Sequence, residues 1–236
     1  YYITEDFEHF EGPFEAFRPQ EGFWADRNFW APEVHFYNGR YYMFATFWAE
    51  RKNRGTQILV SDKIEGPYVP HSDAPVTPHD WMCLDGTLFV DDDSKPWMIF
   101  CHEWVQVYDG EIWAVRLSDD LKKACGEPQY LFCASDAPWV KSIKEKDNHE
   151  CFVTDGPFIY KTSDKKLVML WSSFDEKRRY CVGVAVSKSG NILGPWEHKK
   201  EPIFSNDGGH AMIFKTFDSK LMIGLHSPNS RGNERP

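Results

Sequence analysis

Short apolar runs and short polar turns alternate along the chain, and one such pattern occurs four times. Each copy begins with a strand-like run, passes through a tight polar turn and returns in a second strand rich in aromatic and aliphatic residues. The copies are APEVHFYNGRYYMFATF from Ala31, DGTLFVDDDSKPWMIFCH from Asp85, DGPFIYKTSDKKLVMLWSS from Asp155 and HAMIFKTFDSKLMIGLHS from His210. Their starts lie 54, 70 and 55 residues apart, which predicts blades of a β-propeller rather than short solenoid repeats.

A second element recurs between these copies. It follows a short strand with Ser or Thr and a charge, and it reaches a Gly-Pro or Gly-Glu-Pro turn. Its copies are TEDFEHFEGPF (4–14), SDKIEGPY (61–68), SDDLKKACGEP (118–128) and SKSGNILGPW (187–196). This pattern predicts that the third strand of each blade turns here into the fourth. Segment 134–150 is the least strand-like part of the chain, and we expect a long inter-blade loop with a helical turn.

The two repeats together predict an all-β, five-bladed β-propeller. Its blades would occupy residues 29–78, 84–134, 154–204 and 207 onward, with residues 1–20 as the tail of the first blade. We therefore expect residues 1–236 to form a single propeller domain whose first blade is incomplete, its N-terminal strands apparently missing. In a radial array, equivalent positions converge on one axis. Asp85, Asp155 and His210 hold the same position of three copies, so we expect them to face one another at one end of a central channel.

Composition excludes several classes of function. Of the 236 residues, 42% are hydrophobic, which is enough for one sizeable core. The 27 basic and 36 acidic residues give a net charge of -9 without a basic stripe, which argues against a nucleic-acid partner. No run approaches the roughly 18 apolar residues of a membrane span. The six cysteines form no CxxC pair, so we expect free thiols rather than a zinc ribbon. The chain opens at Tyr1 without a starting Met or a signal segment, so compartment and oligomeric state are not predicted.

Several degenerate motifs, in order along nearly the whole chain, resemble glycoside hydrolase family 43. They are FWAPEVHFYNGRYYMF (29–44), LDGTLFVDDDSKPWMIF (84–100), TDGPFIY (154–160) and GGHAMIF (208–214). The resemblance implies a five-bladed propeller that hydrolyses arabinofuranosyl, xylosyl or galactosyl linkages with inversion. It also implies three acidic residues, which are a general base, a pKa-tuning Asp and a general acid.

The resemblance assigns roles to particular residues. Asp85 matches the tuning Asp. Asp155 stands at the general-acid position, where the family usually has Glu. The base should lie in an Asp-Pro motif upstream of Tyr1. His210 matches a His that points into the central channel, where some relatives hold a calcium ion or a water, so a structural calcium is possible while no cofactor is required.

Glycoside hydrolysis needs one protonated and one ionised carboxyl group, about 6.5–9.5 Å apart in an inverting enzyme. A nearby third carboxylate keeps the acid protonated, and this is the role expected of Asp85 beside Asp155. The alternative is a structural role, in which either Asp, standing before Gly, caps backbone amides in a turn. Glu103 in CHEW (101–104) is the rival acid, because a carboxyl beside an indole in a dry pocket has a raised pKa. Asp91, Asp92 and Asp93 are interpreted as a solvated hairpin turn.

Sugar binding is expected of an aromatic and charged loop before the second blade and of three nearby side chains. Trp offers a stacking face, and charged groups bind hydroxyls, although packing within loops is the simpler explanation for each of them. The candidates are Trp24, Asp26, Phe29, Trp30, Glu33, His102 and Trp104.

Three functions compete at this stage. The first is an exo-acting, inverting glycosidase on plant-type polysaccharides or oligosaccharides. The second is a non-catalytic carbohydrate-binding propeller, which the Asp at the acid position favours. The third, a protein-interaction propeller, is weakest, because such propellers usually carry Trp-Asp repeats, which are absent from this chain.

Overall fold

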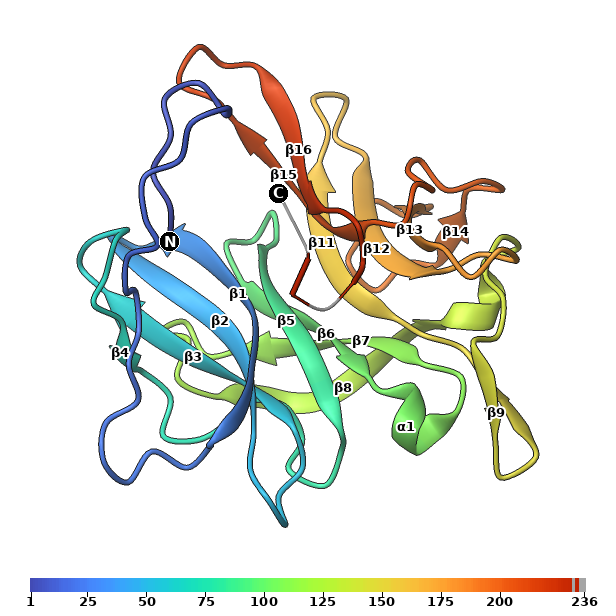
Figure 1. The fold of residues 1–236 in the computed structure, drawn as a ribbon, viewed down its shortest axis with the longest axis horizontal. Coiled ribbons are helices and arrows are strands. Elements are labelled where there is room, and N and C mark those ends of the chain that lie inside the picture. The colour runs from blue at the N-terminus through green and yellow to red at the C-terminus, as the bar shows by residue number, and fades with distance from the viewer. Residues whose placement is uncertain (231, 234–236) are drawn as a thin grey trace.

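The structure is a computed structural model that describes residues 1–230 and 232–233, and it is built almost entirely of antiparallel sheets (Figure 1). The first sheet contains β1 (Arg27–Tyr37), β2 (Arg40–Trp48), β3 (Gly55–Ser61) and β4 (Val69–Pro70). The second contains β5 (Cys83–Val90), β6 (Pro96–His102), β7 (Glu111–Leu117) and β8 (Ala124–Cys133). The third contains β11 (Asp155–Lys161), β12 (Leu167–Phe174), β13 (Tyr180–Ser187) and β14 (Trp196–His198), and a last hairpin contains β15 (Gly209–Lys215) and β16 (Leu221–His226).

Both sequence repeats are confirmed. Each four-stranded sheet runs in chain order, so every strand pairs with its sequence neighbour. The second repeat links third to fourth strands, at β3–β4, β7–β8 and β13–β14. The Asp91 turn is also confirmed, because its carboxylate accepts hydrogen bonds from the backbone of Asp93 and Lys95 and from Trp97 Nε1.

Segment 134–150 differs in part from the prediction. A helical turn is present as a 3-10 helix (Ala134–Asp136), but the loop also holds a small hairpin of β9 (Lys144–Lys146) and β10 (His149–Cys151). The turn residues Asp147 and Asn148 both have positive φ, which short polar side chains tolerate, so this hairpin is set by local turn chemistry. A four-residue helix, α1 (Trp104–Val107), was not expected either.

The sheets are arranged like the blades of a propeller, with β1, β5, β11 and β15 on their inner edges (Figure 1). The inner strand β11 contacts both β5 and β15, and β2 contacts β5. Residues 1–20 lie between the last hairpin and the first sheet: the Phe7 ring is 6.0 Å from that of Phe214, and the Tyr68 N–H donates to Ala16 O at 2.8 Å. No helix among the described residues is both long and apolar enough to cross a membrane.

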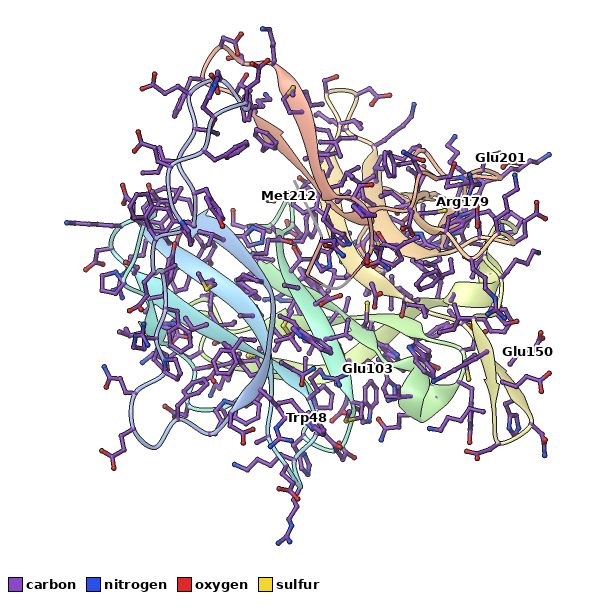
Figure 2. The ribbon with its side chains drawn as sticks, in the orientation of Figure 1. Trp48, Glu103, Glu150, Arg179, Glu201 and Met212 are labelled. Carbon is purple, nitrogen blue, oxygen red and sulfur yellow. The ribbon has the colours of Figure 1, made fainter. Side chains whose placement is uncertain are left out.

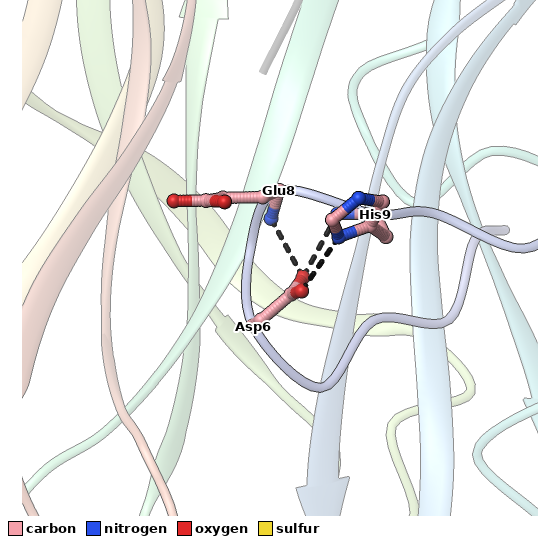
Figure 3. A group of neighbouring side chains, drawn as sticks. All are labelled: Asp6, Glu8 and His9. Carbon is pink, nitrogen blue, oxygen red and sulfur yellow. Dashed lines mark hydrogen bonds and ion pairs between the residues drawn. The ribbon is translucent and has the colours of Figure 1, made fainter.

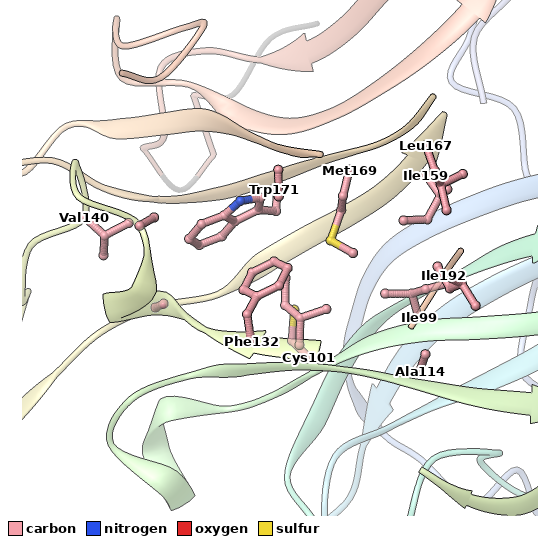
Figure 4. Packing of buried hydrophobic residues seen from close by; sticks show 14 of the residues in the cluster. Ile99, Cys101, Ala114, Phe132, Val140, Ile159, Leu167, Met169, Trp171 and Ile192 are labelled. Carbon is pink, nitrogen blue, oxygen red and sulfur yellow. The ribbon is translucent and has the colours of Figure 1, made fainter. Parts of the chain in front are cut away.

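The largest apolar cluster joins the second sheet to the third (Figure 4). Ile99, Cys101 and Phe132 of the second sheet pack with Met169 and Trp171 of the third. All six cysteines are free, as expected, and Cys101 and Cys181 are buried. This packing holds the inner strands β5 and β11, which carry the two candidate carboxyls, in a fixed relation.

Gly183, in this region, has no room for a side chain. A Cβ built on Gly183 would lie 2.2 Å from Cζ2 of the buried Trp139. We therefore expect Gly183→Ala to lower the free energy of unfolding by about 2 kcal/mol, from overpacking. Urea denaturation measures it, with Gly224→Ala as control, since a Cβ at Gly224 meets its nearest atom at an ordinary 3.7 Å. Equal stability of the two variants would contradict the packing described.

Candidate active site

The inner strands β1, β5, β11 and β15 each carry a β-bulge at the same place. Pairing shifts register between Trp30 and Glu33 in β1 and at the corresponding points of β5, β11 and β15. The residues that open the four bulges all have left-handed backbone; they are Ala31 (φ 45°), Asp85 (φ 56°), Gly156 (φ 51°) and His210 (φ 54°). Bulges re-aim side chains, and positive φ at non-glycine residues is concentrated at functional sites. The four bulges therefore define one site at the end of the inner strands.

This register corrects one prediction. Asp85 and His210 hold equivalent positions, but the third sheet places Gly156 there, and Asp155 stands one residue earlier. By pairing, Asp155 is instead equivalent to Leu84 and Gly209. Asp155 therefore approaches the site from the last paired residue before the bulge, and its carboxyl does not repeat the direction of Asp85.

Hydroxyl groups fix the bulges from one sheet to the next. Thr46 Oγ1 on β2 accepts from the Asp85 N–H at 2.9 Å, and Ser172 Oγ on β12 accepts from the His210 N–H at 2.9 Å. The equivalent residue on β6 is Cys101, and there the acceptor is the Asp85 carboxylate, whose Oδ2 receives the Gly156 N–H at 2.9 Å. Asp85 therefore caps a backbone amide, as the alternative of a turn-capping Asp predicts. The amide, however, belongs to the neighbouring sheet and follows Asp155.

The Asp155 carboxyl is enclosed and has one strong polar partner. Tyr180 Oη donates to Asp155 Oδ2 at 2.9 Å. Burial raises the pKa of Asp155 above its usual range, and the charge of Asp85 raises it further, while the Tyr180 hydroxyl lowers it. Such a carboxyl retains its proton at a pH where an exposed Asp is ionised, as a general acid must.

Asp85 and His210 meet on the opposite side of Gly156. His210 Nδ1 lies 3.7 Å from Asp85 Oδ2, and a Cβ on Gly156 would lie 2.8 Å from His210 Cγ. Burial raises the pKa of Asp85. The Gly156 hydrogen bond opposes this rise, and the charges of Glu103 and Glu33 add to it. Burial lowers the pKa of His210, and the charges of Asp155 and Glu33 oppose this change.

Glu103 is buried, as its role as rival acid requires, but it is also paired (Figure 2). Both of its oxygens accept from Arg54 Nη1, and the Arg54 guanidinium lies 4.7 Å from the Trp30 ring and 5.7 Å from the Trp48 ring. Burial raises the pKa of Glu103, and the charge of Arg54 opposes that rise. An ion-paired carboxylate holds its proton poorly, so the geometry favours Asp155 over Glu103 as the acid.

The loop predicted to bind sugar is partly packed and partly exposed. Trp24 Nε1 donates to Gln57 Oε1 at 2.6 Å, and Phe29 packs edge-on to Phe47 at 5.0 Å. Trp30 is exposed beneath Arg54, whereas the Asp26 carboxylate pairs with Arg27. Trp30 is thus an exposed predicted stacking residue that contacts Arg54, the partner of the buried Glu103.

The other three candidates have partners of their own. Glu33 accepts from Thr87 Oγ1 at 2.6 Å and pairs with His35, beside the Asp85 bulge. His102 stacks on Trp81 with ring centroids 4.4 Å apart, and its two ring nitrogens lie within hydrogen-bond distance of Glu111 and Gln106. Lys144 Nζ stands 4.3 Å from the Trp104 ring. These contacts give all three residues structural tasks, and their sugar-binding role stays a prediction.

The residues around His210 do not form a metal cage. Within the part of the chain described, the only three acids or histidines with ligand atoms within 4.8 Å of one another are Asp6, Glu8 and His9, all exposed (Figure 3). Asp6 there accepts the backbone N–H groups of Glu8 and His9, which accounts for the cluster as a turn. His210 and Asp85 alone do not supply the 6–8 oxygen ligands that calcium takes, so a calcium held at His210 through water stays a prediction.

Sequence reasoning missed Arg54 and Tyr180, the direct partners of Glu103 and Asp155. Arg54 lies 49 residues from Glu103, and Tyr180 lies 25 residues from Asp155. Neither residue carries a local signal, because each side chain meets its carboxyl only once the sheets have packed.

Comparison with known proteins agrees with this geometry. The family model described as "Glycosyl hydrolases family 43" matches residues 2–236. The crystal structure of an endo-arabinase from Bacteroides thetaiotaomicron VPI-5482 superimposes with a TM-score of 0.90 and 49% identity, over 97% of this chain and 78% of that one.

Two curated relatives are more distant. The extracellular exo-alpha-(1->5)-L-arabinofuranosidase of Cellvibrio japonicus (strain Ueda107) is 25% identical over 211 residues, which are 85% of this chain and 58% of that protein. The xylosidase/arabinosidase 43A of Humicola insolens is 32% identical over 84 residues, 34% of this chain and 24% of that protein. The chain thus matches less than two thirds of the length of either relative.

Proposed function

The chain belongs to glycosyl hydrolases family 43, and from this premise we propose that it hydrolyses α-L-arabinofuranosyl linkages of arabinan with inversion. One observation carries the proposal: Asp85 and Asp155 converge on Gly156, Asp85 is buried and Asp155 is half-buried, and the charge of Asp85 raises the pKa of Asp155. Arabinan is chosen because the 49% identical structure is that of an endo-arabinase and the curated relative matched over 85% of this chain is an arabinofuranosidase. Xylosyl linkages are the second choice, on the xylosidase/arabinosidase match, and galactosyl linkages stay a prediction.

In this mechanism Asp155 donates its proton to the oxygen of the leaving sugar. Asp85 is a positioning residue: its Oδ2 fixes the Gly156 amide next to Asp155, and when it is ionised its charge raises the pKa of Asp155. A water attacks the opposite face of the sugar, activated by a base that we place, from the family pattern, on a segment preceding Tyr1. The same segment would complete the first of five blades, beside residues 1–20.

Two modes of cleavage are open to such a site. The sequence predicts exo action, whereas the relative with the higher identity is an endo-arabinase. Incubation of the full-length protein with linear α-1,5-arabinan, followed by sizing of the first products, separates the modes. Single arabinose units support exo action, and a ladder of oligosaccharides supports endo action. No release of sugar from arabinan or xylan would favour a carbohydrate-binding propeller, the reading that Asp rather than Glu at the acid position supports.

The tuning role of Asp85 gives a pH prediction. A general acid works below its own pKa, so activity falls as pH rises through that value. Asp85→Asn removes the charge that raises the pKa of Asp155, so the basic limb of kcat/KM should move to lower pH. The Asn oxygen can still accept the Gly156 N–H, and the exposed Asp93→Asn is the matched control. An unchanged profile in Asp85→Asn would remove Asp85 from the mechanism.

A further inference from the structure

A hollow of about 710 Å³ is lined in part by Arg54, the ion-pair partner of the buried Glu103. Its walls come from the β2–β3 turn (51–55) and the linker between the first and second sheets (73–82), together with Trp24 and Trp48. This volume is within the range of sites that hold small ligands, about 300–1,000 Å³.

The hollow is directly connected to the strand that carries Asp85. Arg54, in its wall, pairs with Glu103. Thr56, one residue past the wall, accepts the Gly86 N–H on Oγ1 at 3.1 Å. A ligand in the hollow would therefore lie close to the strand that carries Asp85.

The charge of this hollow is opposite to that of the protein. Arg51, Lys52 and Arg54 line it, and Asp73 is its single carboxylate, although the whole chain has a net charge of -9. Arg51 and Lys52 are exposed, and neither forms an ion pair within the described part of the chain. Cations gathered without partners in an acidic protein are arranged for an anionic ligand.

Indole rings accompany the cations. Lys52 Nζ lies 5.7 Å from the Trp24 ring, and Arg54 Cζ lies at the same distance from the Trp48 ring. Apolar faces suit the C–H surface of a sugar, and guanidinium and ammonium groups suit a carboxylate, which Arg can bind with two parallel hydrogen bonds. The combination fits an acidic sugar better than a neutral one or a simple anion.

We propose that this hollow is a subsite for a uronic acid unit, so that the arabinofuranosyl linkage cleaved belongs to a polysaccharide that also carries carboxylates. The inference rests on the proposed glycosidase function for its place in a substrate. Binding is nevertheless measurable without catalysis.

Calorimetry on the full-length protein carrying Asp155→Asn tests it, because Asp155 does not line the hollow. The probes are trigalacturonate, a glucuronate-bearing xylotriose, and the methyl ester of each, which keeps the size and removes the charge. We expect one uronate to bind at least about fivefold more tightly than its ester, as one well-placed charge contact gives about 1 kcal/mol. The preferred uronate identifies the source of the acid.

Variants then locate the site. Arg51→Gln with Lys52→Gln should weaken the uronate to the level of its ester and leave the ester unchanged. Lys122→Gln with Lys123→Gln, on the β7–β8 turn outside the lining of the hollow, is the matched control and should alter neither. The proposal would be overturned by equal affinity for acid and ester, by no binding of either, or by an equal loss of uronate affinity in both double variants. None of these outcomes depends on whether the protein hydrolyses arabinan, so a failure here is distinct from a failure of the proposed function.

Discussion

Replacing Asp155 with Asn should lower kcat on arabinotriose by about 10²–10⁴-fold, the contribution of a positioned general acid. The leaving arabinosyl oxygen needs a proton, whereas a 4-nitrophenolate does not. The loss on 4-nitrophenyl α-L-arabinofuranoside should therefore be much smaller. The amide oxygen of Asn can still accept from Tyr180, so the fold around the site is preserved.

Steady-state kinetics on both substrates with the full-length protein measures this difference. Asp164→Asn, an exposed change on the β11–β12 turn, is the matched control and should leave both rates unchanged. If Glu103→Gln, rather than Asp155→Asn, loses activity selectively on the poor leaving group, Glu103 is the acid.

The second large effect concerns stability. Arg54→Met leaves the Glu103 carboxylate buried without its partner, which should cost about 3–5 kcal/mol of unfolding free energy. That loss corresponds to a fall in Tm of roughly 6–20 °C for a domain of this size. Arg40→Met, which breaks an exposed pair with Asp62, is the control and should cost no more than about 1 kcal/mol.

The cost should depend on pH in a defined direction. Burial already raises the pKa of Glu103, and loss of Arg54 raises it further above the unfolded value. A group with a raised folded pKa contributes stability below its unfolded pKa and loses it as pH rises through the folded pKa. The difference between Arg54→Met and wild type should therefore shrink toward acidic pH. The double variant Arg54→Met/Glu103→Leu should recover much of the loss, and a pH-independent loss without recovery would contradict a buried ion pair.

The sheets and their order were predictable from sequence because hairpins have local signals. The polar turn at Asp91 and the Gly-Pro turns at 66–67 and 194–195 each lie between alternating runs, and the structure confirms all three. The family resemblance is likewise confirmed by the match over residues 2–236, because several ordered motifs carry it.

The register of the third inner strand was not predictable in the same way. Asp85-Gly86 and Asp155-Gly156 look identical in sequence, yet the bulge opens at Asp85 in one and at Gly156 in the other. A bulge position depends on cross-strand pairing, and the pairs Leu84–Cys101 and Asp155–Ser172 form only in the folded sheet. The side-chain partners of the acids also depend on the folded sheets, so Arg54 and Tyr180 could not be predicted from the sequence.

Hydrolysis with inversion is tested most directly by the anomeric form of the first sugar released. The full-length protein is mixed with linear α-1,5-arabinan, and the reducing ends are followed by ¹H NMR before mutarotation. We expect β-L-arabinofuranosyl ends first, because an acid and a base on opposite faces of the sugar, with a water on the base side, invert the α linkage. Initial α ends would contradict inversion, and the absence of any new reducing end would contradict the assignment of Asp155 and Asp85 to hydrolysis of arabinan.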